Sequence, residues 1–198
     1  MPRMFGTDGV RGLANRALTA QLALDLGDAA VRVLGDDGDK SEFDGRRRAL
    51  VGRDTRVSGD FLAAALSAGM SAGGFDVIDA GIIPTPGVAY LTSVLNVEMG
   101  AVISASHNPV EYNGIKFFNN QGYKLSDALE DEIENIIMSH PEILPSPTGI
   151  GLGTKEYAED ALDDYIAFLT RTTTEKFDGI KVALDCANGA AYKAAPIA

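Results

Sequence analysis

Apolar positions along this chain fall into short runs separated by segments with helical spacing, an order that predicts alternating strands and helices. The first helix is expected between Thr19, which can cap its N-terminus, and Gly35, which can end it. Its apolar side chains recur close to every fourth position, at Leu22, Leu26, Ala30 and Val33. This spacing places them on one face, which is expected to be buried.

Three buried strands are predicted where short apolar runs are bounded by turn or cap signals, at residues 49–51, 75–79 and 101–103. A helix is expected between the first two strands, from Ser58 as its N-cap through Ala72. Another is expected between the second and third, with Thr85 as N-cap and Pro86 at the first helical position. Strands joined through helices of this length form βαβ units, so they are predicted to be parallel.

Beyond these elements, residues 114–118 are predicted to form a fourth strand, and Ser126 is expected to cap a helix that ends before His140. An amphipathic helix is predicted at residues 156–171, followed by a strand at 180–184. Together these elements predict an α/β fold with a mixed, mostly parallel sheet between helices.

The best linker candidate is the segment 141–153, which contains three prolines and three glycines. It predicts a first domain at residues 1–142, a linker at 143–154 and the start of a second, similar domain at 155–198. Only about 45 residues follow the linker, against the ~100–150 of a typical domain. The second domain is therefore expected to be truncated, and the chain to be a piece of a longer protein.

Composition and charge exclude several classes of protein. The chain is 45% apolar and 23% charged, as folded globular proteins are, and its net charge of −11 argues against a nucleic-acid partner. Its apolar runs fall far short of the ~18 residues of a membrane span, and no signal peptide is recognisable. Cys186, the single cysteine, excludes an internal disulfide and is expected to be a small buried residue. A reducing, cytoplasmic location is expected, and the charged stretch 36–48 is expected to be a solvated loop.

The polar segment 104–109 directly follows the third predicted strand, where ligands bind in open α/β sheets. A tight turn at 113–114 allows Lys116 on the next strand to point toward Ser106. One interpretation is a serine that carries or receives a phosphoryl group; the other is a polar turn that satisfies its own backbone. A Ser-His hydrolase is disfavoured, because no Gly-x-Ser-x-Gly elbow is present and the adjacent Ser106 and His107 side chains should diverge.

Two further loops carry arginines and glycines. Residues 5–12 include three glycines, which can present N–H groups to an anion beside Arg11, or can simply form a turn into the first helix. The segment matches neither the P-loop nor the dinucleotide-binding pattern. Residues 52–56 follow the first buried strand, and Arg53 and Asp54 are expected to pair and stiffen the loops around the site.

Taken together, these segments resemble the α-D-phosphohexomutase family. The resemblance rests on residues 5–12, 52–59, 84–86 and, above all, 104–109 with Asn113, Gly114 and Lys116. Residues 185–190 are similar to the opening of the family's second domain. Each motif alone is weak, but the combination is specific. Family members have four domains, so the chain corresponds to less than half of one.

The resemblance implies a mechanism in which Ser106 is a phosphoserine. Ser106 would donate its phosphoryl group to glucosamine 6-phosphate and then recover one from position 6 of the bisphosphate, leaving glucosamine 1-phosphate. Arg11 and Lys116 match active-site cations, and His107 lines the same loop. Mg²⁺ would bind a phosphoryl oxygen on Ser106, with its aspartate ligands outside this chain.

Among the branches of the family, the chain most resembles the one that acts on glucosamine phosphates. The product of that reaction would enter amino-sugar synthesis for the cell wall. A phosphomannomutase or phosphoglucomutase is the alternative among isomerases. A binding module or inactive fragment is the non-enzyme alternative. The expected partner is a sugar phosphate, with no nucleic acid and no membrane; the resemblance leaves a homodimer possible.

Overall fold

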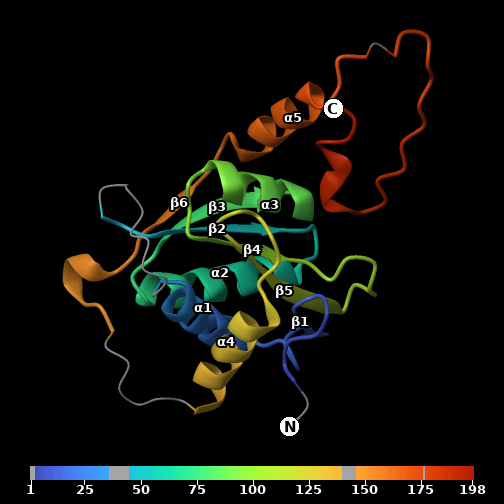
Figure 1. Ribbon diagram of the computed structural model, residues 1–198. Helices are drawn as coiled ribbons and strands as arrows, with labels where there is room; N and C mark the ends of the chain where they lie inside the picture. Colours follow the sequence, from blue (N-terminus) through green and yellow to red (C-terminus); the bar gives the residue numbers. More distant parts are fainter. Residues whose placement is uncertain (1–2, 36–44, 140–145, 176) are drawn as a thin grey trace.

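A six-stranded sheet with the order β1-β5-β4-β2-β3-β6 forms the centre of the molecule (Figure 1). The computed structural model describes residues 3–35, 45–139, 146–175 and 177–198. In sheet order, the strands are Val10–Leu13 (β1), Tyr112–Asn119 (β5), Met99–Ile103 (β4), Arg48–Arg53 (β2), Asp76–Ile82 (β3) and Lys155–Tyr157 (β6). Strands β4, β2, β3 and β6 are parallel, whereas β5 is antiparallel to β4 and to β1. The predicted mixed, mostly parallel sheet is therefore confirmed.

Helices cover both faces of this sheet, as Figure 1 shows. One face carries Ala20–Gly35 (α1), Ser58–Ala72 (α2) and Asp127–Ser139 (α4), and the other carries Thr85–Val94 (α3) and Ala161–Arg171 (α5). Two short 3₁₀ turns lie at Gly149–Gly151 and Ala190–Tyr192. No helix in the described ranges is long and apolar enough to cross a membrane.

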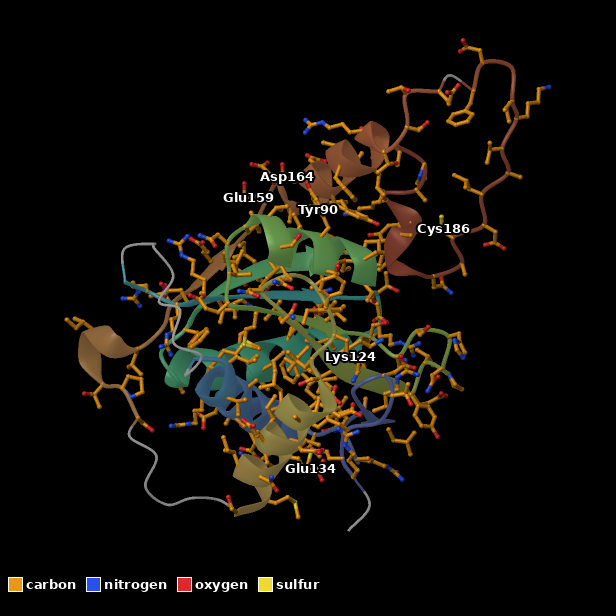
Figure 2. All side chains as sticks on the ribbon, viewed as in Figure 1. Tyr90, Lys124, Glu134, Glu159, Asp164 and Cys186 are labelled. Carbon is orange, nitrogen blue, oxygen red and sulfur yellow. The ribbon has the colours of Figure 1, made fainter. Side chains whose placement is uncertain are left out.

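Each face of the sheet has its own apolar core. Ala49 and Val51 of β2 pack into the core under α1, α2 and α4, while Leu50 between them packs under α3 and α5. Successive strand side chains point to opposite faces, so a strand covered on both sides reads as one apolar run. On the second face, Tyr90 of α3, labelled in Figure 2, stacks on Phe168 of α5 with ring centroids 3.9 Å apart.

Two of the predicted helix caps are confirmed and two are wrong. Thr19 Oγ1 accepts the Leu22 N–H at 3.1 Å, and Ser126 caps α4 in the same way. The predicted caps Ser58 and Thr85 are instead the first residues of α2 and α3, and the residues before them, Val57 and Pro84, take the cap positions without a side-chain hydrogen bond. The Ser58 hydroxyl is used elsewhere, as described below.

The prediction for residues 156–171 is wrong at its start. Residues 155–157 form β6, which extends the sheet alongside β3, and the helix begins only at Ala161. Lys155 Nζ lies 2.7 Å from an Asp79 carboxylate oxygen, which holds β6 in place. The strand predicted at 180–184 is also wrong: the segment is extended but pairs with no strand among the described residues, and its apolar side chains are 57–72% exposed.

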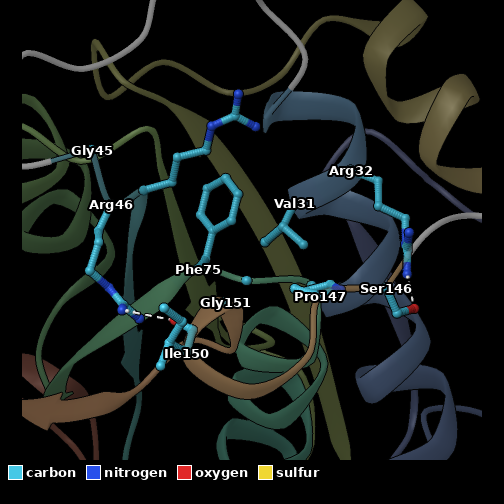
Figure 3. A pocket seen from close by; sticks show the side chains of 12 residues that line it. Val31, Arg32, Gly45, Arg46, Phe75, Ser146, Pro147, Ile150 and Gly151 are labelled. Atoms are coloured by element: carbon cyan, nitrogen blue, oxygen red, sulfur yellow. Dashed lines mark hydrogen bonds between the residues drawn. The ribbon is translucent and has the colours of Figure 1, made fainter.

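The described part of the predicted linker lies against the sheet edge. Thr154 donates its N–H and its hydroxyl to Asp76 at 2.7 and 2.8 Å, and Gly153 donates its N–H to the Ser71 carbonyl at 2.9 Å. Arg46 reaches the Ile150 carbonyl across a cleft (Figure 3). The domain boundary at 143–154 stays a prediction, although β6 and α5 beyond it pack on the same sheet. Most of the expected 36–48 loop, and His140, lie outside the described residues.

Candidate active site

The carboxyl ends of β2, β3 and β4 open into one surface cleft of about 890 Å³. The loops that follow these strands line it with residues 54–57, 83–86, 104 and 106–108. A fourth wall is formed by residues 186–191, and the Thr55 hydroxyl donates a hydrogen bond to the Asn188 carbonyl of this wall. Cys186, labelled in Figure 2, is half-buried on this wall rather than buried in a core, so its predicted burial is wrong. Such an edge is where open α/β sheets bind ligands.

Ser106 lies exposed at the mouth of this cleft, on a tight turn directly after β4. Its φ is +56°, a left-handed conformation that costs a non-glycine residue about 1–3 kcal/mol and persists only where the surroundings hold it. The Ser106 N–H donates to Ser104 Oγ at 3.1 Å, and the Asn108 N–H donates to the Ala105 carbonyl at 3.0 Å. These bonds keep the backbone polar groups of the turn paired.

His107 lies beside Ser106, with its Nδ1 3.4 Å from Ser106 Oγ. The expectation that these adjacent side chains diverge is therefore wrong, because the left-handed turn at Ser106 brings them to the same side. A small movement of the imidazole ring would bring its nitrogen within proton-transfer distance of the hydroxyl.

Arg11 and Lys116 both pair with Asp8. Arg11 Nη2 and Lys116 Nζ each lie 3.3 Å from a different Asp8 carboxylate oxygen. The hydrogen bond from Lys116, together with the charges of Lys116 and Arg11, lowers the pKa of Asp8. Arg11 Nε is buried without a hydrogen-bond partner in the described part of the chain. The approach of Lys116 to Ser106 stays a prediction.

Gly114 explains how β1 and β5 come so close to the end of β4. It pairs with Arg11 across β1 and β5, and its carbonyl accepts the Ser104 N–H at 2.9 Å. A Cβ on Gly114 would lie 2.8 Å from Arg11 Cγ and 2.9 Å from the Ser104 carbonyl oxygen, closer than such contacts allow. The glycine therefore lets Arg11 lie directly beside the strand that ends in the serine loop.

The glycine-rich loop at 5–12 forms a closed turn. The N–H and carbonyl groups of Gly6 and Gly9 bond to each other at 3.0 and 3.3 Å. Gly9 has a φ of +83°, which favours glycine. The N–H groups of Gly6 and Gly9 are therefore already paired within the turn.

The predicted pairing of Arg53 with Asp54 is wrong. Arg53 pairs with Asp60 at 2.6 Å, while Asp54 pairs with Arg56 at 3.0 Å. Asp54 begins a bend after β2, where its carboxylate also accepts the Arg56 backbone N–H at 3.0 Å, and this turn brings Arg56 to it. Arg56 is the functional candidate that the sequence reasoning missed: it donates to four backbone carbonyls of the serine loop. Carbonyl partners leave no trace in a sequence, so only its place after a buried strand pointed to it.

A second tie holds the other end of the loop. Asn113 is fully buried and donates its side-chain N–H to Ser58 Oγ at 2.9 Å, linking the start of β5 to the start of α2.

The described residues contain no group of three or more His, Cys, Asp or Glu side chains that could hold a metal ion. The serine loop thus presents an exposed serine beside a histidine, while Arg11 and Lys116 lie on the adjacent strands β1 and β5.

Comparisons with known proteins match both the sequence and the fold of this chain. Residues 2–143 match the family described as phosphoglucomutase/phosphomannomutase, alpha/beta/alpha domain I. The phosphoglucosamine mutase of Bifidobacterium adolescentis is 66% identical over 99% of this chain, and that of Ruminiclostridium cellulolyticum is 55% identical over 100%. The chain spans only 44% and 43% of these relatives, less than half of their length.

Solved structures show the same fold. A phosphoglucomutase/phosphomannomutase family protein from Burkholderia thailandensis superposes with a TM-score of 0.68 at 28% identity, covering 83% of this chain and 34% of that one. A putative phosphomannomutase from Thermus thermophilus gives 0.70 at 29% identity, covering 87% and 36%. The sheet, the serine loop at its carboxyl edge and these matches lead to one conclusion: the chain belongs to the phosphoglucomutase/phosphomannomutase family and contains its α/β/α domain I.

Proposed function

We propose that this chain acts as the phosphoserine-bearing part of an enzyme that interconverts glucosamine 6-phosphate and glucosamine 1-phosphate. The observation that carries the proposal is Ser106: an exposed hydroxyl in a left-handed turn at the carboxyl edge of the sheet. Relatives that share 55–66% of its residues are named phosphoglucosamine mutases, which supports this sugar over others.

In the proposed reaction, Ser106 alternately gives and receives a phosphoryl group. The bond from phosphorus to Ser106 Oγ breaks as a bond to O1 of glucosamine 6-phosphate forms, giving a bisphosphate. After this intermediate turns over in the site, the bond from phosphorus to O6 breaks and the bond to Ser106 Oγ forms again. The proton lost by the sugar O1 hydroxyl in the first step goes to Ser106 Oγ as that oxygen leaves phosphorus, and the second step passes it from Oγ to O6. His107, beside Oγ, is suited to relay this proton.

Arg11 and Lys116 are proposed to steady the transferring group. A phosphoserine brings about −1.5 to −2 charges, and phosphoryl transfer depends mostly on positioning and charge neutralisation. Both cations now share Asp8, a single carboxylate that is 55% exposed, so a phosphoryl group can compete with it.

Mg²⁺ is part of what the resemblance implies, but the described residues do not fit a complete metal site. They hold no cluster of three or more candidate ligands, so a magnesium ion on the phosphoryl group would need carboxylates from elsewhere. When bound, such an ion would neutralise phosphoryl charge. The steps assigned above therefore use only Ser106, His107, Arg11 and Lys116.

The phosphoglucomutase and phosphomannomutase reactions remain the alternative, favoured by the name of the Thermus relative. A cytoplasmic location, a homodimer and a role in forming cell-wall precursors also belong to this proposal. The lone Cys186, which allows no internal disulfide, supports the reducing location.

Intact-mass spectrometry of the full-length protein tests the proposal. We expect a mass increase of one phosphoryl group that disappears in Ser106→Ala and persists in Ser93→Ala, a matched change at an exposed serine of α3. Ser106→Ala should also lose turnover of glucosamine 6-phosphate. Assays with a panel of mannose and glucose phosphates separate the phosphomannomutase and phosphoglucomutase alternatives. Full turnover by Ser106→Ala, or an unphosphorylated protein in every preparation, would refute the assignment.

A further inference from the structure

Arg56 uses its whole guanidinium group inside the serine loop. A guanidinium has five N–H donors, and the structure gives five hydrogen bonds to acceptors. Nε donates to Asp54 at 3.0 Å; Nη1 donates to the carbonyls of Pro109 and Tyr112 at 2.7 and 3.0 Å; Nη2 donates to those of Ser106 and Asn108 at 3.0 and 2.8 Å. The Arg56 side chain is only 11% exposed. The loop from Ser106 to Tyr112 is thus folded around one cation.

Asp54 fixes the direction of this guanidinium. One of its oxygens accepts the Arg56 backbone N–H at 3.0 Å, and the other accepts Nε. The Asp54 N–H itself donates to the Ile103 carbonyl at 2.9 Å, which ties the end of β2 to the end of β4. Arg56 therefore reaches the serine loop from a base that is anchored on both strands.

The contacts leave the reacting atoms untouched. Arg56 bonds to the Ser106 carbonyl, not to its hydroxyl, and its charge is balanced by Asp54 at 3.0 Å. It can therefore hold the backbone without drawing a phosphoryl group toward itself. Ser106 needs such support, because its left-handed φ of +56° is unfavourable for serine.

We infer that Arg56 is a positioning residue, which holds the Ser106 backbone in one conformation while the hydroxyl gives and receives the phosphoryl group. The inference rests on the proposed function. Phosphoryl transfer needs the serine oxygen in the same place in both half-reactions, and a misplacement of about 1 Å can cost about 100-fold in rate. Lysine cannot replace this arginine, since an ammonium has three donors and no planar fork.

The test compares Arg56→Met, Arg56→Lys and the control Arg53→Met in the full-length protein. Arg53, the last residue of β2, lies three positions before Arg56 but pairs with Asp60, which is 74% exposed. We expect kcat to fall about 100-fold in Arg56→Met and at least about 10-fold in Arg56→Lys, with KM changed less than about threefold. Arg53→Met should keep the wild-type kcat and KM.

Hydrogen-exchange mass spectrometry supplies a readout that does not depend on activity. Amides of residues 104–112 should exchange faster in both Arg56 variants, while the α1 and α2 amides keep their wild-type rates. If Arg56→Met does not fold, kcat and hydrogen exchange are compared between Arg56→Lys, Asp54→Asn and the wild type instead. A wild-type kcat in a folded Arg56 variant, unchanged exchange at 104–112, or equal loss of exchange protection throughout the domain would overturn the inference. A wild-type protein without phosphoserine would refute the proposed function instead, and leave the exchange result to decide the role of Arg56.

Discussion

The carboxylate of Asp76 joins the sheet edge to the chain segment that leads to β6, and its removal has a calculable cost. The Arg46 hydrogen bond, with those from Thr154, lowers the pKa of Asp76 from 3.8 to about 2. Each tenfold change in proton affinity corresponds to about 1.4 kcal/mol, so the full difference is roughly 2 kcal/mol at pH 7. Arg46 is 39% exposed, and solvent screening reduces this to about 1 kcal/mol.

Asp76→Asn should therefore lower the free energy of unfolding at pH 7 by about 1 kcal/mol. A carboxylate whose folded pKa is depressed stabilises the fold above its unfolded value of 3.8, and this contribution is lost as the pH falls through about 2. The wild type should thus lose stability relative to the variant between pH 4 and pH 2, and the two should converge at the acid end.

Urea unfolding followed by circular dichroism, at pH values from 7 down to 2, measures this difference. Glu159→Gln, which removes an exposed carboxylate just before α5, controls for the change in net charge (Figure 2). Identical stability of Asp76→Asn and wild type at pH 7, or a difference that does not shrink in acid, would show that this carboxylate does not anchor the segment.

Two further predictions concern the site and the core. Lys116→Met in the full-length protein should slow turnover about 100-fold without changing the unfolding midpoint, since it removes a cation that steadies the phosphoryl group. Lys193→Met is the control. Equal turnover in both variants would show that Lys116 does not belong to the site. Leu66→Ala should cost about 2–5 kcal/mol in urea unfolding, because Leu66 is fully buried between α2 and the sheet. Leu24→Ala, at a side chain 36% exposed, should cost less than about 1 kcal/mol, and a similar loss in both would contradict the assigned core.

The sheet and the place of the serine loop were predictable from the sequence for the same reason. Strands buried on both faces read as short apolar runs, and Ala49, Leu50 and Val51 show why: they alternate between two separate cores. Once the strands are parallel, their carboxyl ends share an edge. Ser106 directly follows one of them, so its position at that edge needed no knowledge of side-chain contacts.

The contacts that hold the serine loop were not predictable, because they involve backbone atoms. Arg56 recognises four carbonyls, which every residue carries, so no residue type marks its partners. Adjacency in the sequence suggested Arg53 with Asp54, whereas the turn that Asp54 makes with the Arg56 backbone N–H brings the Arg56 side chain to it. The start of β6 was missed because a three-residue strand at a sheet edge depends on its neighbour, β3, and not on its own apolar pattern.

The serine loop is held from two sides through its backbone, and this has a consequence for which positions can vary. Arg56 supports the loop from the end of β2, and Gly114 lets β1 and β5 close on it from the other side. Neither contact involves the side chains of His107 or Asn108. Changes at those two positions should therefore alter proton transfer or ligand contact while Ser106 keeps its place. Changes at Arg56 or Gly114 should instead move Ser106 itself, although neither residue touches the phosphoryl group.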